Sequence, residues 1–168
     1  VLPSRRADRR HEVPPDLESV IKRCLEKDPA ERFPDGMALA QALEGFLEGS
    51  RRRDESERLA GLGDGKSSEY RRAADAASRK EEALRQRRSS PAPLADATFR
   101  QQLWAGEAWW RDLRRIRDNT YDEAIALYQS ALKTDSDNSA ARDGLARLYV
   151  RRMEEAERRG ELATARFY

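Results

Sequence analysis

The stretch YDEAIALYQSALKTDSDNSAARDGLARLY, residues 121–149, decides the fold of the C-terminal third of the chain. It predicts one helix over about residues 121–133 and a second over about residues 139–159, with the polar run 135–138 as their connection. No segment of the chain alternates apolar and polar residues with the sustained period of two that a strand requires. The sequence therefore predicts an all-α fold.

The same stretch resembles a tetratricopeptide repeat, a helical hairpin that stacks on its own copies. The family's A-x3-F element is matched by Ala124 and Tyr128, and its next small position by Ala131. The L-G-x2-Y element of the following repeat is matched by Leu145, Ala146 and Tyr149. The pattern departs from the family at Ser136, Arg142 and Arg158, so the match amounts to about one and a half repeats. The resemblance implies close packing of two helices through small residues, and a protein ligand of the repeat region.

Residues 13–47 predict two amphipathic helices joined by a proline-containing turn. The run Val13-Pro14-Pro15-Asp16 favours a helix start, because proline is tolerated there and an acidic residue suits the positive end of the helix dipole. Asp28-Pro29 is expected to end this helix, Asp35 to cap the next one, and Gly49 to end it. The apolar stripes consist of Leu17, Val20, Ile21, Cys24 and Leu25, then Leu39, Ala40, Leu43, Phe46 and Leu47.

The order of residues in this segment resembles the C-terminal end of a eukaryotic-like serine/threonine protein kinase domain of the bacterial kind. Cys24-Leu25 stands near the end of the first helix, and Lys27-Asp28-Pro29 precedes Arg32-Phe33-Pro34 and the closing helix. The resemblance implies that residues 1–49 are the remnant of a kinase domain, whose parent transfers phosphate from ATP–Mg to serine or threonine. The missing kinase lobes would be its partners, and without them these helices are expected to expose an apolar patch.

The resemblance also implies a role for Arg32. In the family this arginine pairs with the glutamate of the Ala-Pro-Glu motif, and a guanidinium binds a carboxylate through two parallel hydrogen bonds. The chain contains no Ala-Pro-Glu, Val-Ala-Ile-Lys, His-Arg-Asp or Asp-Phe-Gly motif. Asp28, Pro29 and Arg32 are therefore structural residues in this interpretation. The chain alone is expected to be inactive, with no catalytic residue, cofactor or metal.

The middle of the chain, residues 50–96, is interpreted as a charged helical linker, and residues 97–168 as the tetratricopeptide-like region. Residues 61–65, Gly-Leu-Gly-Asp-Gly, predict a flexible break. Residues 67–88 and 97–117 predict long helices, with a turn at 118–120. We expect these two helices to pair antiparallel, because a short proline-containing connection joins them.

Three tryptophans lie within seven residues of the second long helix. Trp104 and Trp110 cannot share one narrow helical face with Trp109, so one ring is expected to be exposed. An exposed indole favours partner docking, and packing is the alternative. The candidate docking residues are Trp104, Trp109, Trp110, Tyr128 and Tyr149.

Composition bears on several other kinds of site. Residues 50–117 hold 17 basic and 11 acidic side chains. We expect them to form a solvated helix with paired charges that does not bind nucleic acid. The one histidine, His11, has no neighbouring ligand for a metal, and Cys24 is expected to be a buried structural thiol. A single cysteine and the lack of an apolar run of about 20 residues predict a cytoplasmic chain without a membrane span.

Three functions stay open. The first is a fragment of a serine/threonine kinase whose tail presents a protein-docking surface; the chain lacks an initial methionine and stops in mid-pattern, so both ends look cut. The second is a freestanding helical adaptor that binds a protein through the repeat region and has no kinase activity. The third is a basic helical protein that binds nucleic acid.

Overall fold

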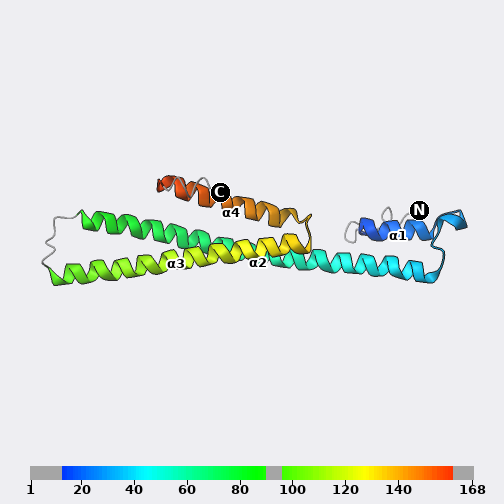
Figure 1. The fold of residues 1–168 in the computed structure, drawn as a ribbon, viewed down its shortest axis with the longest axis horizontal. Helices are drawn as coiled ribbons and strands as arrows, with labels where there is room; N and C mark the ends of the chain where they lie inside the picture. The colour runs from blue at the N-terminus through cyan, green and yellow to red at the C-terminus, as the bar shows by residue number, and fades with distance from the viewer. Residues whose placement is uncertain (1–12, 90–95, 161–168) are drawn as a thin grey trace. The chain divides into compact units, whose positions relative to one another are not determined.

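The computed structural model describes residues 13–89 and 96–160 (Figure 1). Within these ranges the fold is all-α, as predicted, with four α-helices and no strand. The elements are α1 (Pro15–Cys24), a 3₁₀ helix (Pro29–Glu31), α2 (Gly36–Arg88), α3 (Ala97–Thr134) and α4 (Ser139–Arg158). The chain forms two compact units, Val1–Asp54 (unit 1) and Glu55–Tyr168 (unit 2). None of the described helices is both long enough and apolar enough to cross a membrane.

Unit 1 is organised by caps at its helix ends. Pro15 begins α1, as predicted, but the helix ends at Cys24, earlier than the predicted stop. The Leu25 N–H closes the last turn on the Ile21 and Lys22 carbonyls. Asp28 then begins the 3₁₀ helix, where its carboxylate accepts a hydrogen bond from the Ala30 N–H at 2.9 Å. The Asp35 carboxylate accepts a hydrogen bond from the Ala38 N–H at 2.8 Å, so the predicted cap is confirmed.

Unit 1 has no fully buried side chain among residues 13–54. Leu25, Met37 and Leu47 are all exposed, and Cys24 is only half-buried, whereas the sequence predicted a buried thiol. The described part of the unit includes a solvent-exposed ion pair between Arg53 and Asp16 at 3.1 Å. Of its apolar stripes, Leu17, Val20, Ile21, Leu39 and Phe46 are half-buried, whereas Leu25, Leu43 and Leu47 are exposed.

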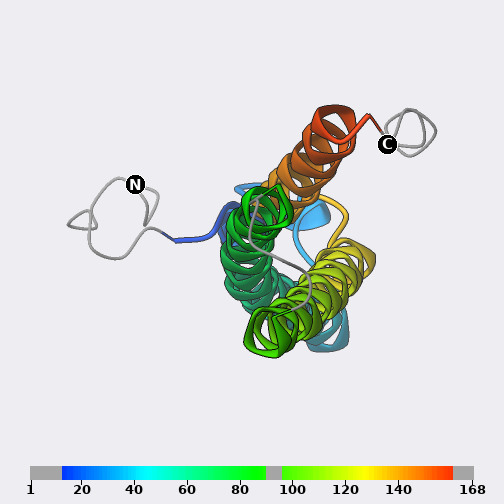
Figure 2. The same ribbon diagram turned by 90° about the vertical axis from the view of Figure 1, so that its left-hand side faces the viewer.

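Unit 2 contains three helical segments, and the predicted antiparallel pairing of its two long helices is confirmed. Arg88 of α2 lies 2.7 Å from Glu107 near the start of α3, whereas Lys66 lies 2.8 Å from Glu123 further along α3. The α4 helix folds back along α3 (Figure 1), and viewed along their axes the three helices lie side by side (Figure 2).

The core of unit 2 is made of small residues and tyrosines. Its buried members are Ala60, Tyr70, Ala74, Tyr121, Ala124, Tyr128, Ala131, Ala141 and Leu148. Alanines allow the helices to approach closely, and the tyrosine rings fill the space that remains; the Tyr70 and Tyr121 ring centroids are 5.3 Å apart. The close packing that the sequence predicts is present at Ala124 and Ala131, whereas Ala146, the third predicted small position, is exposed.

The predicted break at residues 61–65 is wrong, because α2 runs through these glycines without interruption. Gly63 is buried against the Tyr128 ring, and a Cβ at this position would lie 2.8 Å from Tyr128 Cε1. Gly144 of α4 approaches the same ring edge, where a Cβ would lie 2.5 Å from Cε1. We call this arrangement the Tyr128 slot. Close packing, and not backbone freedom, explains Gly63.

Two further predicted interruptions are also wrong. The α2 helix continues past Gly49. Gly49 does not adopt the positive φ of a helix-ending glycine; within the described ranges only Gly160 does, with φ 71°. The α3 helix continues through residues 118–120, where the Thr120 hydroxyl donates to the Ile116 carbonyl at 2.8 Å. A threonine can satisfy its hydroxyl in this way inside a helix, so a polar run alone does not make a turn.

Ser56 joins α2 to the connection between α3 and α4. Its buried hydroxyl donates to the Ala131 carbonyl at 2.8 Å and accepts from Asn138 Nδ2 at 2.7 Å. Ser56→Ala is expected to lower the free energy of unfolding by about 1–2 kcal/mol, because both partners lose a buried hydrogen bond. Urea unfolding measures the change. The exposed Ser78→Ala serves as the control, and equal effects of the two substitutions would contradict the expectation.

Candidate protein-docking site

The three tryptophans of α3 lie on different faces of the helix. Trp104 is 63% exposed and Trp109 is 58% exposed, so two rings reach solvent where the sequence predicted one. The Lys80 ammonium lies 4.6 Å from the Trp109 ring centroid. Trp110 is half-buried, and the Arg114 guanidinium lies 4.9 Å from its ring centroid. Cations thus stack on two of the three indoles, an arrangement that holds a ring in place.

The two candidate tyrosines lie away from these tryptophans. Tyr128 is 1% exposed and fills its slot, with its hydroxyl donating to Asp64 at 2.7 Å. Tyr149 is half-buried and packs against the core. We assign Tyr128 to the core and propose no docking role for it.

The predicted kinase-motif residues lie in unit 1 and make local contacts. Asp28 caps the 3₁₀ helix, and Pro29 is the first residue of that helix. Arg32 Nε donates to the Glu26 carbonyl oxygen at 2.7 Å. This bond ties the loop after α1 together. Pairing of Arg32 with a glutamate stays a prediction.

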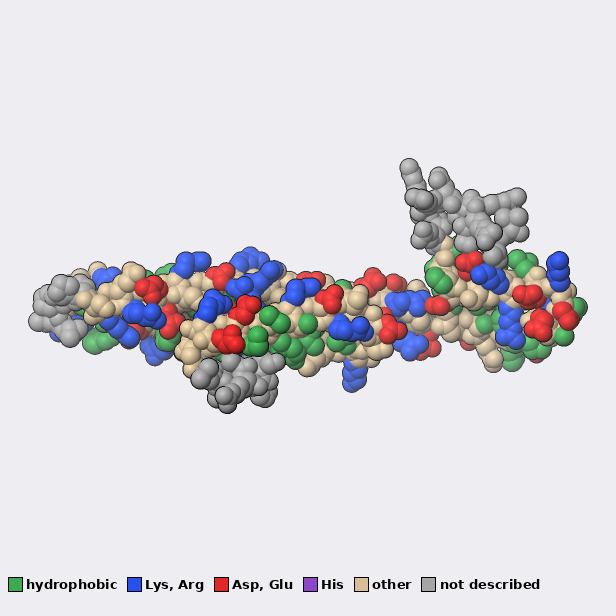
Figure 3. Space-filling model, turned by 90° about the horizontal axis from the view of Figure 1, so that it is seen from above, with side chains coloured by type: hydrophobic (Ala, Val, Ile, Leu, Met, Phe, Trp, Pro, Cys, Tyr) green, Lys and Arg blue, Asp and Glu red, His purple; other side chains and the backbone are tan. Residues whose placement is uncertain are grey.

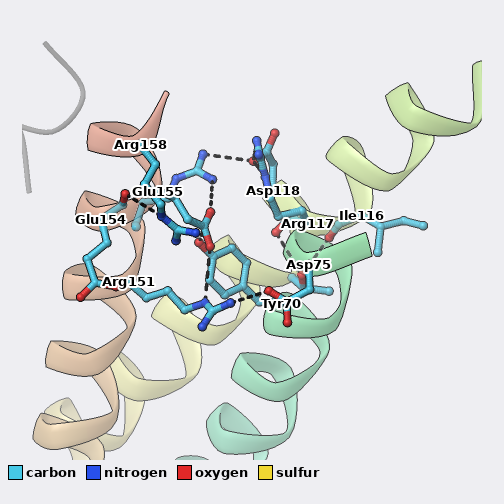
Figure 4. Close-up of polar contacts among 11 residues, drawn as sticks. Tyr70, Asp75, Ile116, Arg117, Asp118, Arg151, Glu154, Glu155 and Arg158 are labelled. Carbon is cyan, nitrogen blue, oxygen red and sulfur yellow. Dashed lines mark hydrogen bonds and ion pairs between the residues drawn. The ribbon is translucent and has the colours of Figure 1, made fainter. Parts of the chain in front are cut away.

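A polar cluster joins the three helices of unit 2 (Figure 4). Glu155 of α4 is 7% exposed and accepts a hydrogen bond from the Tyr70 hydroxyl at 2.9 Å. Its carboxylate also lies 3.4 Å from Arg151 Nε and 3.9 Å from Arg152 Nη1. Arg151 reaches Asp75 of α2 at 2.7 Å. The cluster therefore connects α4 to α2 by two routes.

Arg117 of α3 is the other buried charge in this cluster and is 1% exposed. Its Nε and Nη2 donate to Asp118 Oδ1 at 2.9 and 2.7 Å, and Asp118 also accepts from Arg152 of α4 at 3.1 Å. Sequence reasoning missed the cluster. A signal was present, because Glu155 follows the buried Leu148 by seven residues, two helical turns, and so lies on the buried stripe.

Ionisation of two core tyrosines is expected to lower the free energy of unfolding at alkaline pH. Burial raises the pKa of Tyr128 to about 12, and its hydrogen bond to Asp64 adds to the rise. Burial and the Glu155 carboxylate also raise the pKa of Tyr70. A folded-state pKa above the unfolded value of about 10 gives stability that is complete below pH 10 and is lost as the pH rises through the folded value.

Urea unfolding at a series of pH values measures this dependence. The free energy of unfolding is expected to be flat below about pH 9 and to fall above about pH 10. Tyr128→Phe should make the fall shallower, because phenylalanine has no proton to lose. A fall of the same slope in Tyr128→Phe and in Tyr70→Phe would assign the pH dependence to other groups.

The basic excess of the middle segment is partly matched by nearby carboxylates. Figure 3 shows lysine and arginine side chains interspersed with aspartate and glutamate along the helices. Pairs three residues apart include Arg58–Glu55, Arg85–Glu82 and Arg115–Asp112. This arrangement is that of the solvated helix expected from the sequence. Among the residues that the structure describes, no group of three or more histidine, cysteine, aspartate or glutamate side chains is placed to hold a metal ion.

Comparison with known families identifies one region of the chain. A tetratricopeptide repeat model matches residues 115–164, which include all of α4 and the part of α3 that packs on it. No curated protein and no solved structure matches the chain. No comparison supports the kinase resemblance of residues 13–47, and the cytoplasmic location and the absence of a cofactor also stay predictions. The match at residues 115–164 confirms the predicted resemblance there and indicates a helical protein-interaction region.

Proposed function

We propose that the chain is a protein-interaction module whose binding surface lies on unit 2. The observation that carries the proposal is the tetratricopeptide match over the α3–α4 hairpin. Helical repeats of this type stack to form extended binding surfaces for other proteins. The hairpin is well packed, with Ala124, Ala131 and Ala141 fully buried, so it suits the role of a rigid scaffold.

The exposed indoles of Trp104 and Trp109 support this function. A tryptophan that reaches solvent over more than half of its surface leaves a large apolar area in water, and burial of that area on a partner would be favourable. Tryptophan is also enriched among the interface residues that contribute most to binding free energy. Both rings are therefore proposed anchors for the partner.

The double variant Trp104→Ala/Trp109→Ala tests the proposal. A protein captured by the full-length chain is purified, and its dissociation constant is measured by calorimetry with the wild type and with the variant. Affinity is expected to fall by about tenfold or more. Leu62→Ala is the control. It removes an exposed apolar side chain from α2 and should leave the affinity unchanged. Full affinity in the double variant, or no specific partner at all, would refute the proposal.

Residues 13–47 carry a second proposal, that unit 1 is the terminal piece of a kinase domain whose parent transfers phosphate to serine or threonine. It is supported by the order of Asp28, Pro29 and Arg32 and by the exposed members of the apolar stripes of unit 1, Leu25, Leu43 and Leu47. A missing lobe would cover those stripes. His-Arg-Asp and Asp-Phe-Gly motifs encoded upstream, within roughly 150 residues, would support this origin. An upstream region without them would leave the adaptor as the remaining function.

A further inference from the structure

The α4 helix covers only part of the pair formed by α2 and α3 (Figure 1). Near its C-terminal end, Glu155 and Arg158 line a small pocket together with Glu81 and Arg85 of α2. A second pocket, with a volume of about 270 Å³, is lined by Glu81, Leu84, Arg85, Arg88, Ser89 and Trp110. Glu81 and Arg85 line both pockets, the first pocket toward α4 and the second toward α3. We call the second pocket the open groove.

The open groove has an apolar wall and a basic rim. Leu84 is buried and Trp110 is half-buried, whereas Arg85 and Arg88 are exposed. Trp110 Nε1 is buried and has no hydrogen-bond acceptor among the described residues. The groove therefore combines apolar surface with two exposed guanidinium groups and one half-buried carboxylate, that of Glu81.

The helix ends around the open groove carry an excess of positive charge. Residues 78–89 and 96–110 contain six basic and four acidic side chains. Arg85 pairs with Glu82 at 3.2 Å and Arg88 with Glu107 at 2.7 Å, and all four side chains of these pairs are substantially solvent-accessible. Such surface pairs contribute at most about 1 kcal/mol each, so a ligand carboxylate can replace them.

We propose that the open groove binds an acidic segment of a partner protein. One apolar side chain of the segment packs against Leu84 and Trp110, and flanking carboxylates bind Arg85 and Arg88. The pocket volume of about 270 Å³ is below the roughly 300–1,000 Å³ typical of small-molecule sites, so it suits a single anchoring side chain. Charge complementarity selects an acidic partner, because guanidinium groups bind carboxylates through charge-assisted hydrogen bonds.

This inference rests on the proposed function and names the chemistry of the partner. The three tryptophans of the chain, Trp104, Trp109 and Trp110, all lie in the first half of α3, so their fluorescence reports on this end of unit 2. The probe is a short synthetic peptide with one phenylalanine among glutamates, titrated into the full-length chain. The matched peptide has glutamine in place of every glutamate.

The acidic peptide is expected to change the tryptophan fluorescence saturably, and the glutamine peptide to bind about tenfold more weakly or worse. Raising the ionic strength from about 0.05 to about 0.5 M should weaken binding of the acidic peptide, because salt screens exposed charges. Equal binding of the two peptides, or no response to either, would overturn the proposal. So would saturable binding of a single-stranded oligonucleotide with no binding of the acidic peptide.

Charge reversal on the rim locates the site. Arg85→Glu/Arg88→Glu is expected to weaken binding of the acidic peptide by about tenfold or more, with an unchanged circular dichroism spectrum. Arg79→Glu makes the same kind of change in the same helix and lines no part of the open groove, so it should bind like the wild type. Equal losses in the two variants would overturn the assigned site.

The outcomes separate the inference from the function on which it rests. A captured partner whose binding depends on Trp104 and Trp109, together with a peptide that fails to bind, would leave the function standing and remove the acidic ligand. If the chain binds neither a partner protein through Trp104 and Trp109 nor the acidic peptide, the proposed function is refuted as well.

Discussion

Replacing Gly144 with alanine is expected to destabilise the protein by about 2 kcal/mol, although alanine favours a helix over glycine by about 1 kcal/mol. A Cβ at this position would lie 2.5 Å from Tyr128 Cε1 and Cζ. The ring has little freedom to move away, because it is buried and its hydroxyl is bonded to Asp64 at 2.7 Å. Overpacking of this kind costs typically about 1–3 kcal/mol, and this clash lies at the severe end.

Gly65→Ala is the matched control, since it makes the same change inside α2. No atom lies within 4 Å of a Cβ built at Gly65, so alanine should stabilise the helix by about 0.5–1 kcal/mol. Urea unfolding followed by circular dichroism is expected to give changes of opposite sign for the two variants. A Gly144→Ala protein as stable as the wild type would show that the Tyr128 slot has room for a methyl group.

Glu155→Ala is expected to lower the free energy of unfolding by about 3 kcal/mol. The substitution leaves the buried Tyr70 hydroxyl without its acceptor, which lies at 2.9 Å in the wild type. It also removes a carboxylate that faces Arg151 and Arg152 across 3.4 and 3.9 Å. Breaking a buried charge network in this way costs about 3–5 kcal/mol, and the remaining bonds of Arg151 to Asp75 and of Arg152 to Asp118 hold the loss near the lower value.

Glu155→Gln separates the hydrogen bond from the charge. Glutamine keeps an acceptor for Tyr70 but loses the attraction to the two arginines, so about half of the destabilisation is expected. A double-mutant cycle of Glu155→Ala with Tyr70→Phe should show a coupling energy of about 1 kcal/mol, because the two residues share one bond. Strictly additive losses would mean that the Tyr70–Glu155 contact contributes nothing to stability.

Local patterns predicted the elements of this fold that depend on nearby residues. The connection at 135–138 and the cap at Asp35 involve partners a few positions away, and the spacing of the tryptophans correctly placed them on different faces. The α3–α4 hairpin was predictable for the same reason, because its small residues recur within one stretch of sequence.

Several features that escaped prediction depend on residues far apart in the chain. Gly63 looks like part of a hinge until Tyr128 packs on it from α3. The Tyr70–Glu155 bond joins residues 85 positions apart. The sequence could show that Glu155 lies on a buried stripe, but it could not show that Tyr70 is its partner.

Hydrogen exchange on the full-length chain, with and without a captured partner, shows which unit binds. Binding through unit 2 is expected to slow amide exchange over the first half of α3 and the last turns of α2, around Trp104, Trp109 and Arg88, while α1 exchanges at its free rate. Protection confined to residues 13–54, with no change in unit 2, would contradict the assignment of the docking surface to unit 2.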